Sequence, residues 1–153
     1  MNERLDILGP SGPPRREIVQ VGTILVIALL LRLAALAAFP NLIATDTAKY
    51  IQAGQELFEH GQISIDNVMP LYPAWTYITG GGLGLKLADI TLSVLTVGLL
   101  YCLTLEVFRS TNAAKLAAAI AAAYPFFLYY SVLRLSETAF IFLTCSAFLA
   151  LYR

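Results

Sequence analysis

Long apolar runs separated by short polar stretches make up most of the chain. Four runs approach the length of a membrane-spanning helix, at about residues 18–39, 88–108, 113–130 and 136–152. At about 1.5 Å per residue the first run extends roughly 33 Å, which is enough to cross a hydrocarbon core of about 30 Å. Pro125 interrupts the third run and predicts a kink, and the alanine blocks before it favour close helix packing. The pattern predicts an all-α membrane protein with four transmembrane helices.

Polar residues gather between the first two runs, in a loop of residues 40–87. This loop is expected to carry a helix of residues 47–60, with Thr45 or Asp46 as its N-cap and Gly61 as its stop. The apolar residues of that helix fall on one face and its charged residues elsewhere. Such an amphipathic juxtamembrane helix favours a position along the membrane surface.

The second half of the loop is rich in proline, glycine and aromatic residues. Met69-Pro70-Leu71-Tyr72-Pro73 holds two prolines within five residues, so no helix is expected there. Tyr72, Trp75 and Tyr77 are of the types enriched at the level of the lipid headgroups. We expect this stretch to lie close to the membrane and to lead into the second span.

Composition agrees with the membrane class, since 58% of the residues are hydrophobic, 13% are charged and the mean hydropathy is +0.72. In an average soluble domain about a quarter of the residues are charged. The net charge of zero gives no long-range attraction to nucleic acid. Cys102 and Cys145 lie inside apolar runs and are expected to be small buried thiols. His60 is the single histidine, so a zinc site of the usual kind has no support.

Basic residues set the predicted orientation. With the N-terminus inside, six of them are cytoplasmic and three lie outside. The inside set is Arg4, Arg15, Arg16, Arg109, Lys115 and Arg153, and the outside set is Lys49, Lys86 and Arg134. Residues 1–17 contain a run of glycine and proline and are expected to form a disordered, basic cytoplasmic tail. The sequence therefore predicts a multi-pass protein of the plasma (inner) membrane, with residues 40–87 outside the cytoplasm.

Asp46, Lys49 and Tyr50 share one side of the first turns of the expected loop helix. Asp46 can cap that helix, or it can act as a general base toward an acceptor hydroxyl or amine. A carboxylate beside a cation and a phenol suits a phosphate-bearing sugar donor. The same side chains can also form an ordinary surface ion pair, and the spacing leaves both interpretations open.

Charged residues near the outer ends of the spans allow similar alternatives. Arg32 lies inside the first run, where an arginine is costly and usually paired. Its expected role is either to pair with Asp89 or Glu137 or to lie near a lipid phosphate. Arg134 and Glu137 flank the tip between the third and fourth runs, where they can form an interfacial pair or line a cavity above the loop.

Several stretches resemble the N-terminal part of GT-C glycosyltransferases. The nearest group contains the protein O-mannosyltransferases, the lipid A aminoarabinose transferases and related sugar transferases of rhizobial lipopolysaccharide. The similar stretches are Asp46-Thr47-Ala48-Lys49-Tyr50, Met69-Pro70-Leu71-Tyr72-Pro73, residues 113–117 through Tyr124-Pro125, and Ser131 through Ser136-Glu137. Thr47 stands where the family often has a second acid, and Met69 stands where some members have a lysine. These differences leave the donor and the metal requirement open.

The resemblance implies transfer of a sugar from a polyprenyl-phosphate-linked donor to a lipid, glycan or protein acceptor outside the cytoplasm. It makes Asp46 the catalytic base or the group that orients the acceptor, and Lys49 a ligand of the donor phosphate. The further substrate-binding candidates are Tyr50, Tyr72, Arg134 and Glu137. No cofactor is implied, apart from a divalent metal ion that stays open. Family enzymes have many more spans, so we expect a fragment that is completed by a C-terminal part or a second chain.

Two other functions compete with the transferase. A four-span accessory subunit could hold a lipid or a partner without catalysis. A small transporter is disfavoured, because transport sites gather charges near the midplane and the sequence places only Arg32 at such a depth.

Overall fold

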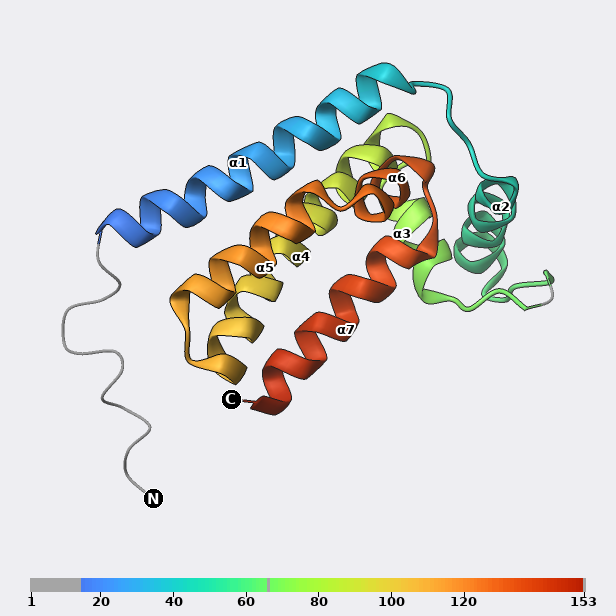
Figure 1. Ribbon diagram of the computed structural model, residues 1–153. Helices are drawn as coiled ribbons and strands as arrows, with labels where there is room; N and C mark the ends of the chain where they lie inside the picture. The colour runs from blue at the N-terminus through green and yellow to red at the C-terminus, as the bar shows by residue number, and fades with distance from the viewer. Residues whose placement is uncertain (1–14, 66, 153) are drawn as a thin grey trace.

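The computed structural model describes residues 15–65 and 67–152, and its regular structure in these residues is all α-helix (Figure 1). The helices are α1 (Arg15–Ala38), α2 (Thr45–His60), α3 (Leu71–Ile78), α4 (Leu83–Phe108), α5 (Thr111–Ala123), α6 (Pro125–Leu133) and α7 (Ser136–Tyr152). The predicted all-α class is confirmed. Most of the expected cytoplasmic tail lies outside the described residues, and its last three residues, 15–17, begin α1.

The described residues contain two helices that are long and apolar enough to cross a membrane. These are α1, with 24 residues, and α4, with 26 residues. The pair α5 and α6 qualifies as a third span if the two helices are counted together across their 51° bend. α7 is a shorter apolar helix of 17 residues. Length and composition thus support two or three spans rather than clearly four.

The long helices run alongside one another in a bundle, and α4 contacts α1, α5, α6 and α7 (Figure 1). Small side chains form the core where α1, α4 and α5 meet. This core cluster consists of Ala28, Val97, Ala118, Ala121 and Ala122. The prediction that the alanine blocks permit close packing is confirmed, because small residues let helix backbones approach one another.

The predicted kink at Pro125 is a complete break between two helices. α5 ends at Ala123, Tyr124 is extended with φ −65° and ψ 120°, and Pro125 begins α6. Proline suits the first position of a helix, because the missing N–H would have no partner within the helix there. The break leaves the last carbonyl groups of α5 available to other donors.

The proline-rich stretch forms α3, so the prediction of no helix at Met69–Pro73 was wrong for its last three residues. Pro70 lies at the N-cap and Pro73 lies in the first turn of α3. The N–H groups of the first turn have no acceptor within a helix, so proline at these positions removes no hydrogen bond.

The ends of α2 differ in how well the sequence predicted them. Ala44 is the N-cap, and no side chain caps this end, so the expectation for Thr45 or Asp46 was wrong; both lie in the first turn. Gly61 ends the helix as predicted. It has φ 71°, and its N–H donates to the carbonyl oxygen of Leu57 over 3.0 Å.

Candidate functional site

α2 and α3 pack against one another as a helical hairpin at the end of the bundle where α4 begins and α6 leads into α7 (Figure 1). Gly54 of α2 lies directly against the backbone of α3. A Cβ at this position would lie 2.5 Å from the carbonyl oxygen of Pro73 and 2.9 Å from Oγ1 of Thr76. The Thr76 hydroxyl is buried and lies 2.7 Å from the carbonyl oxygen of Pro73 and 3.1 Å from that of Tyr50. The missing side chain at Gly54 therefore fixes the distance between the two helices.

Polar contacts attach this hairpin to the bundle. The buried hydroxyl of Thr47 lies 3.2 Å and 3.3 Å from the carbonyl oxygens of Leu133 and Arg134, at the C-terminal end of α6. The last carbonyl groups of a helix lack N–H donors within their own helix, so a hydroxyl donor from α2 satisfies them. This contact places the first turn of α2 beside the link between α6 and α7.

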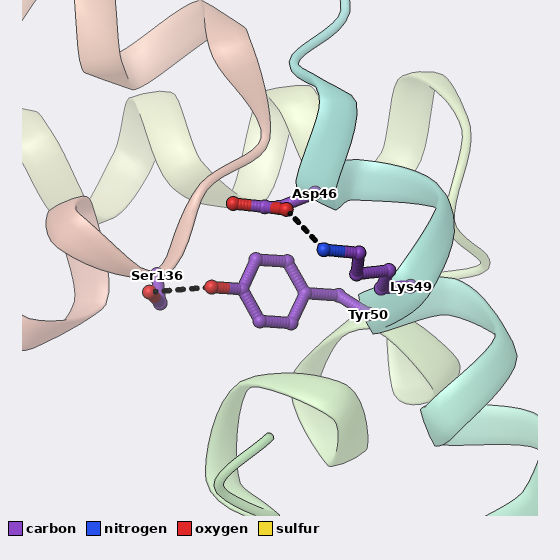
Figure 2. Close-up of polar contacts among 4 residues, drawn as sticks. All are labelled: Asp46, Lys49, Tyr50 and Ser136. Carbon is purple, nitrogen blue, oxygen red and sulfur yellow. Dashed lines mark hydrogen bonds and ion pairs between the residues drawn. The ribbon is translucent and has the colours of Figure 1, made fainter. Parts of the chain in front are cut away.

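Asp46 and Lys49 form an ion pair of 2.9 Å at the start of α2 (Figure 2). Their side chains are 52% and 60% exposed, so water screens the pair. The ordinary surface ion pair considered from the spacing is thus formed. The exposed carboxylate also stays within reach of a molecule at the surface.

Tyr50 points from α2 to the beginning of α7. Its hydroxyl lies 3.2 Å from Oγ of Ser136 (Figure 2). Its ring packs edge-on against the ring of Tyr72, with 5.0 Å between the centroids and 82° between the planes. The two tyrosines thus connect the hairpin with the bundle.

Asp89 of α4 receives two hydrogen bonds from α3. The Tyr72 hydroxyl donates over 2.7 Å and the Trp75 indole N–H over 3.2 Å. Asp89 is fully buried, so these bonds offset part of the cost of removing a carboxylate from water. Burial, followed by the negative charge of Asp89, raises the pKa of Tyr72, which keeps the phenol protonated as a donor. Sequence reasoning had considered Asp89 only as a partner of Arg32.

Arg134 and Glu137 form no ion pair with one another. Arg134 ends α6 in the left-handed conformation, with φ 59°, and its Nη1 donates to the carbonyl oxygen of Gly81 over 3.1 Å. Glu137 lies in the first turn of α7, where a negative charge faces the positive end of the helix dipole. The sequence left two alternatives for these residues, an interfacial pair or a position that lines a cavity. Arg134 lines a cavity, which is described next.

An open cavity of about 430 Å³ lies between the C-terminal end of α1 and the start of α4. Arg134 and Lys86 supply its charged groups, and none of the described residues that line it is a carboxylate. Its other lining residues are Leu33, Leu36, Ala37, Pro40, Gly82 and Leu83. Lys86 donates one of its three N–H groups to the carbonyl oxygen of Pro40 over 2.6 Å. The cavity combines an apolar wall with two cations, which suits an anionic group attached to an apolar chain.

Arg32 pairs with neither of the acids proposed from the sequence. Its Nε donates to Oγ of Ser93 over 2.7 Å, and its Nη1 donates to the carbonyl oxygens of Ala28 and Ala122 over 2.9 Å and 3.2 Å. Ala122 lies in the last turn of α5, where the break at Pro125 frees carbonyl groups and the helix dipole is negative. The fully buried guanidinium therefore stabilises the end of a helix.

Four buried polar residues of α4 form a stripe that sequence reasoning missed. Lys86, Asp89, Ser93 and Thr96 follow one another at intervals of three, four and three residues, and all are at most 4% exposed. This helical spacing within an apolar run was the available signal. It also means that Arg32 is not the only ionisable group inside the apolar helices.

The structure divides the six predicted site residues into two groups. Asp46 and Lys49 are exposed at the start of α2, whereas Tyr50, Tyr72, Arg134 and Glu137 lie where α2, α3, α4, α6 and α7 meet. Within residues 15–65 and 67–152, no three His, Cys, Asp or Glu side chains are grouped as a metal site.

Comparison of the chain with protein-family models, curated proteins and solved structures found no match. The resemblance to GT-C glycosyltransferases therefore rests on the sequence motifs alone.

Proposed function

We propose that this chain is part of a membrane glycosyltransferase that takes a sugar from a polyprenyl-phosphate-linked donor on the extracytoplasmic side. The proposal includes four spans, formed by α1, α4, the bent pair α5–α6, and α7, with a cytoplasmic N-terminus. In this topology the hairpin of α2 and α3 and the cavity between α1 and α4 lie on the outer side of the plasma membrane.

The cavity lined by Lys86 and Arg134 is the observation that carries the proposal. Two cations beside leucine and alanine side chains match a lipid phosphate, whose head is anionic and whose chain is apolar. Lys86 is only 4% exposed, so its charge acts in surroundings of low dielectric, where electrostatic attraction is strong.

The chemical step breaks the bond between the anomeric carbon and the phosphate oxygen, and forms a bond between that carbon and an acceptor oxygen or nitrogen. The leaving phosphate gains a negative charge, which Lys86 and Arg134 would stabilise. The acceptor proton passes to a carboxylate, and Asp46 is the exposed candidate for this role. Lys49, which is paired with Asp46, remains a candidate ligand of the donor.

The main test is binding of a polyprenyl phosphate to the purified chain in lipid nanodiscs, measured by the ligand-induced rise in Tm. Lys86→Gln and Arg134→Gln should each weaken binding roughly 10- to 100-fold, because a charge-assisted hydrogen bond contributes about 1.5–3 kcal/mol. Lys115→Gln, at the far end of the bundle, is the matched control. The polyprenol without its phosphate should bind poorly. Equal affinity for the alcohol and the phosphate would refute the cavity as a phosphate site.

A second candidate function is lipid binding without catalysis. The ion pair between Asp46 and Lys49 favours it, because the carboxylate is already neutralised by a neighbour on its own helix. Asp46→Asn in the complete enzyme separates the two functions. It should abolish sugar transfer and leave lipid-phosphate affinity unchanged if the chain is catalytic, whereas an unaltered function would identify a binding subunit.

A further inference from the structure

α3 has the opposite distribution of side chains from a helix that is surrounded by water. Leu71 and Ile78 are 63% and 69% exposed, and Tyr77 is also exposed. Thr76 has the one aliphatic hydroxyl of the helix, and it is buried and bonded to backbone carbonyls. No residue of α3 is charged. A segment surrounded by lipid must satisfy its polar groups internally and can leave apolar side chains exposed, as α3 does.

α2 forms the other side of the same hairpin, and its exposed residues are mostly polar, with Phe58, 50% exposed, as the large apolar exception. Its exposed residues include Lys49, Gln52, Gln55, Glu59 and His60. The stacked rings of Phe58 and Tyr77, 4.3 Å apart, lie where α2 meets α3. The hairpin thus has a water-compatible helix and a lipid-compatible helix back to back.

The contacts of α3 indicate its depth. α4 has 26 residues and is about 39 Å long, which exceeds a hydrocarbon core of about 30 Å by roughly three residues at each end. Asp89 lies six residues, about 9 Å, along α4 from Leu83. The Tyr72 hydroxyl and the Trp75 indole both reach Asp89, so the inner side chains of α3 extend to a part of α4 that falls within the hydrocarbon boundary.

The exposed apolar surface of α3 is continuous along the chain with that of α4. The turn of residues 79–82 is followed directly by Leu83, which is 63% exposed, and Leu87 one turn later is exposed as well. If lipid contacts the exposed start of α4, the same lipid layer therefore reaches Ile78 of α3.

From these observations we infer that α3 is embedded in the outer leaflet of the membrane. Its exposed face, formed by Leu71 and Ile78, lies against lipid acyl chains, and α2 lies between α3 and the water. The occupant of this face is lipid rather than a second protein. The inference does not depend on sugar transfer, because the lipid contact rests on exposure, composition and depth; the choice of the outer leaflet rests on the topology proposed above.

Trp75 is the single tryptophan and supplies a test without mutation. The chain is reconstituted into phosphatidylcholine vesicles whose acyl chains are brominated either near the headgroup or near the bilayer centre. Shallow bromine should remove most of the indole fluorescence, deep bromine should remove less, and aqueous iodide should remove little. Quenching by iodide but not by bromine would overturn the inference.

A matched pair of variants examines the two faces in the Trp75→Phe background. Ile78→Trp places the indole on the exposed side of α3, and Gln55→Trp places it on the exposed side of α2. The first should respond to shallow bromine and the second to iodide. Equal responses from the two variants would contradict the proposed orientation. Neither quenching measurement depends on binding of a lipid phosphate. A negative result for the depth of α3 can therefore be told apart from a negative result for the proposed function.

Discussion

At the scale of single residues, Arg32 shows how this bundle accommodates a buried charge without an acid. The guanidinium donates to one hydroxyl and two carbonyl oxygens, and one of those carbonyls is at the end of α5. The cation faces the negative end of a helix dipole, so part of the burial cost is offset by the helix break itself. The charge and the break at Pro125 therefore depend on one another.

We expect Arg32→Ala to lower the free energy of unfolding by roughly 2–5 kcal/mol, because it opens a cavity and leaves the end of α5 without a donor. The measurement is denaturant or thermal unfolding in detergent. Arg16→Ala, at an exposed position of the same helix, should change stability by less than about 0.5 kcal/mol. Arg32→Met retains most of the side-chain volume and separates lost packing from lost hydrogen bonds. Wild-type stability in Arg32→Ala would rule out the capping role.

At the scale of helices, we expect substitution of glycine by alanine to have opposite effects on stability at two positions, Gly54 and Gly22. Gly54→Ala should destabilise the hairpin, because its Cβ would lie 2.5 Å from backbone that cannot move without displacing α3. Gly22→Ala in α1 has no atom within 4 Å of the added Cβ, so it should be neutral or stabilise the protein by up to about 1 kcal/mol. Unfolding in detergent gives both values. The emission of Trp75 should change only in Gly54→Ala, and a stabilised Gly54→Ala would show that the hairpin is packed differently.

The sequence predicted helices better where the signal is a long run than where it is a short motif. The fourth run and α7 both begin at Ser136, because the apolar run that follows has helical length and the chain turns just before it. α3 was missed because proline was weighed by its number rather than by its position in the first turn. The N-cap of α2 was misplaced because Thr45 and Asp46 suit a cap equally well as residue types, while the backbone turns one residue earlier, at Ala44.

At the scale of the whole molecule, the arrangement of the candidate site could not be read from the sequence. Its cavity joins α1, the start of α4 and the end of α6, which are far apart along the chain. Lys86 entered the sequence reasoning only as an external charge, because nothing local shows that it meets Arg134. Tyr50, Tyr72 and Arg134 were selected through motifs, and their contacts with Ser136, Asp89 and Gly81 depend on how the hairpin docks.

Topology is the remaining property of the whole molecule, and single cysteines can determine it. In a background of Cys102→Ala and Cys145→Ala, Gln55→Cys lies on the exposed face of α2 and Asn112→Cys lies at the opposite end of α4, at the start of α5. We expect a membrane-impermeant maleimide to label Gln55→Cys in intact cells and Asn112→Cys only after permeabilisation.

A reporter fused to the C-terminus distinguishes four spans from three. With four spans the C-terminus lies on the same side as the N-terminus, so a fluorescent reporter should be protected from external protease. With three spans, α7 lies outside the hydrocarbon and the reporter is digested. If instead Asn112→Cys were labelled in intact cells and Gln55→Cys only after permeabilisation, the proposed function would be contradicted. Lys86 and Arg134 would then lie at the cytoplasmic face. The basic residues argue against that arrangement, since six would then have to lie outside.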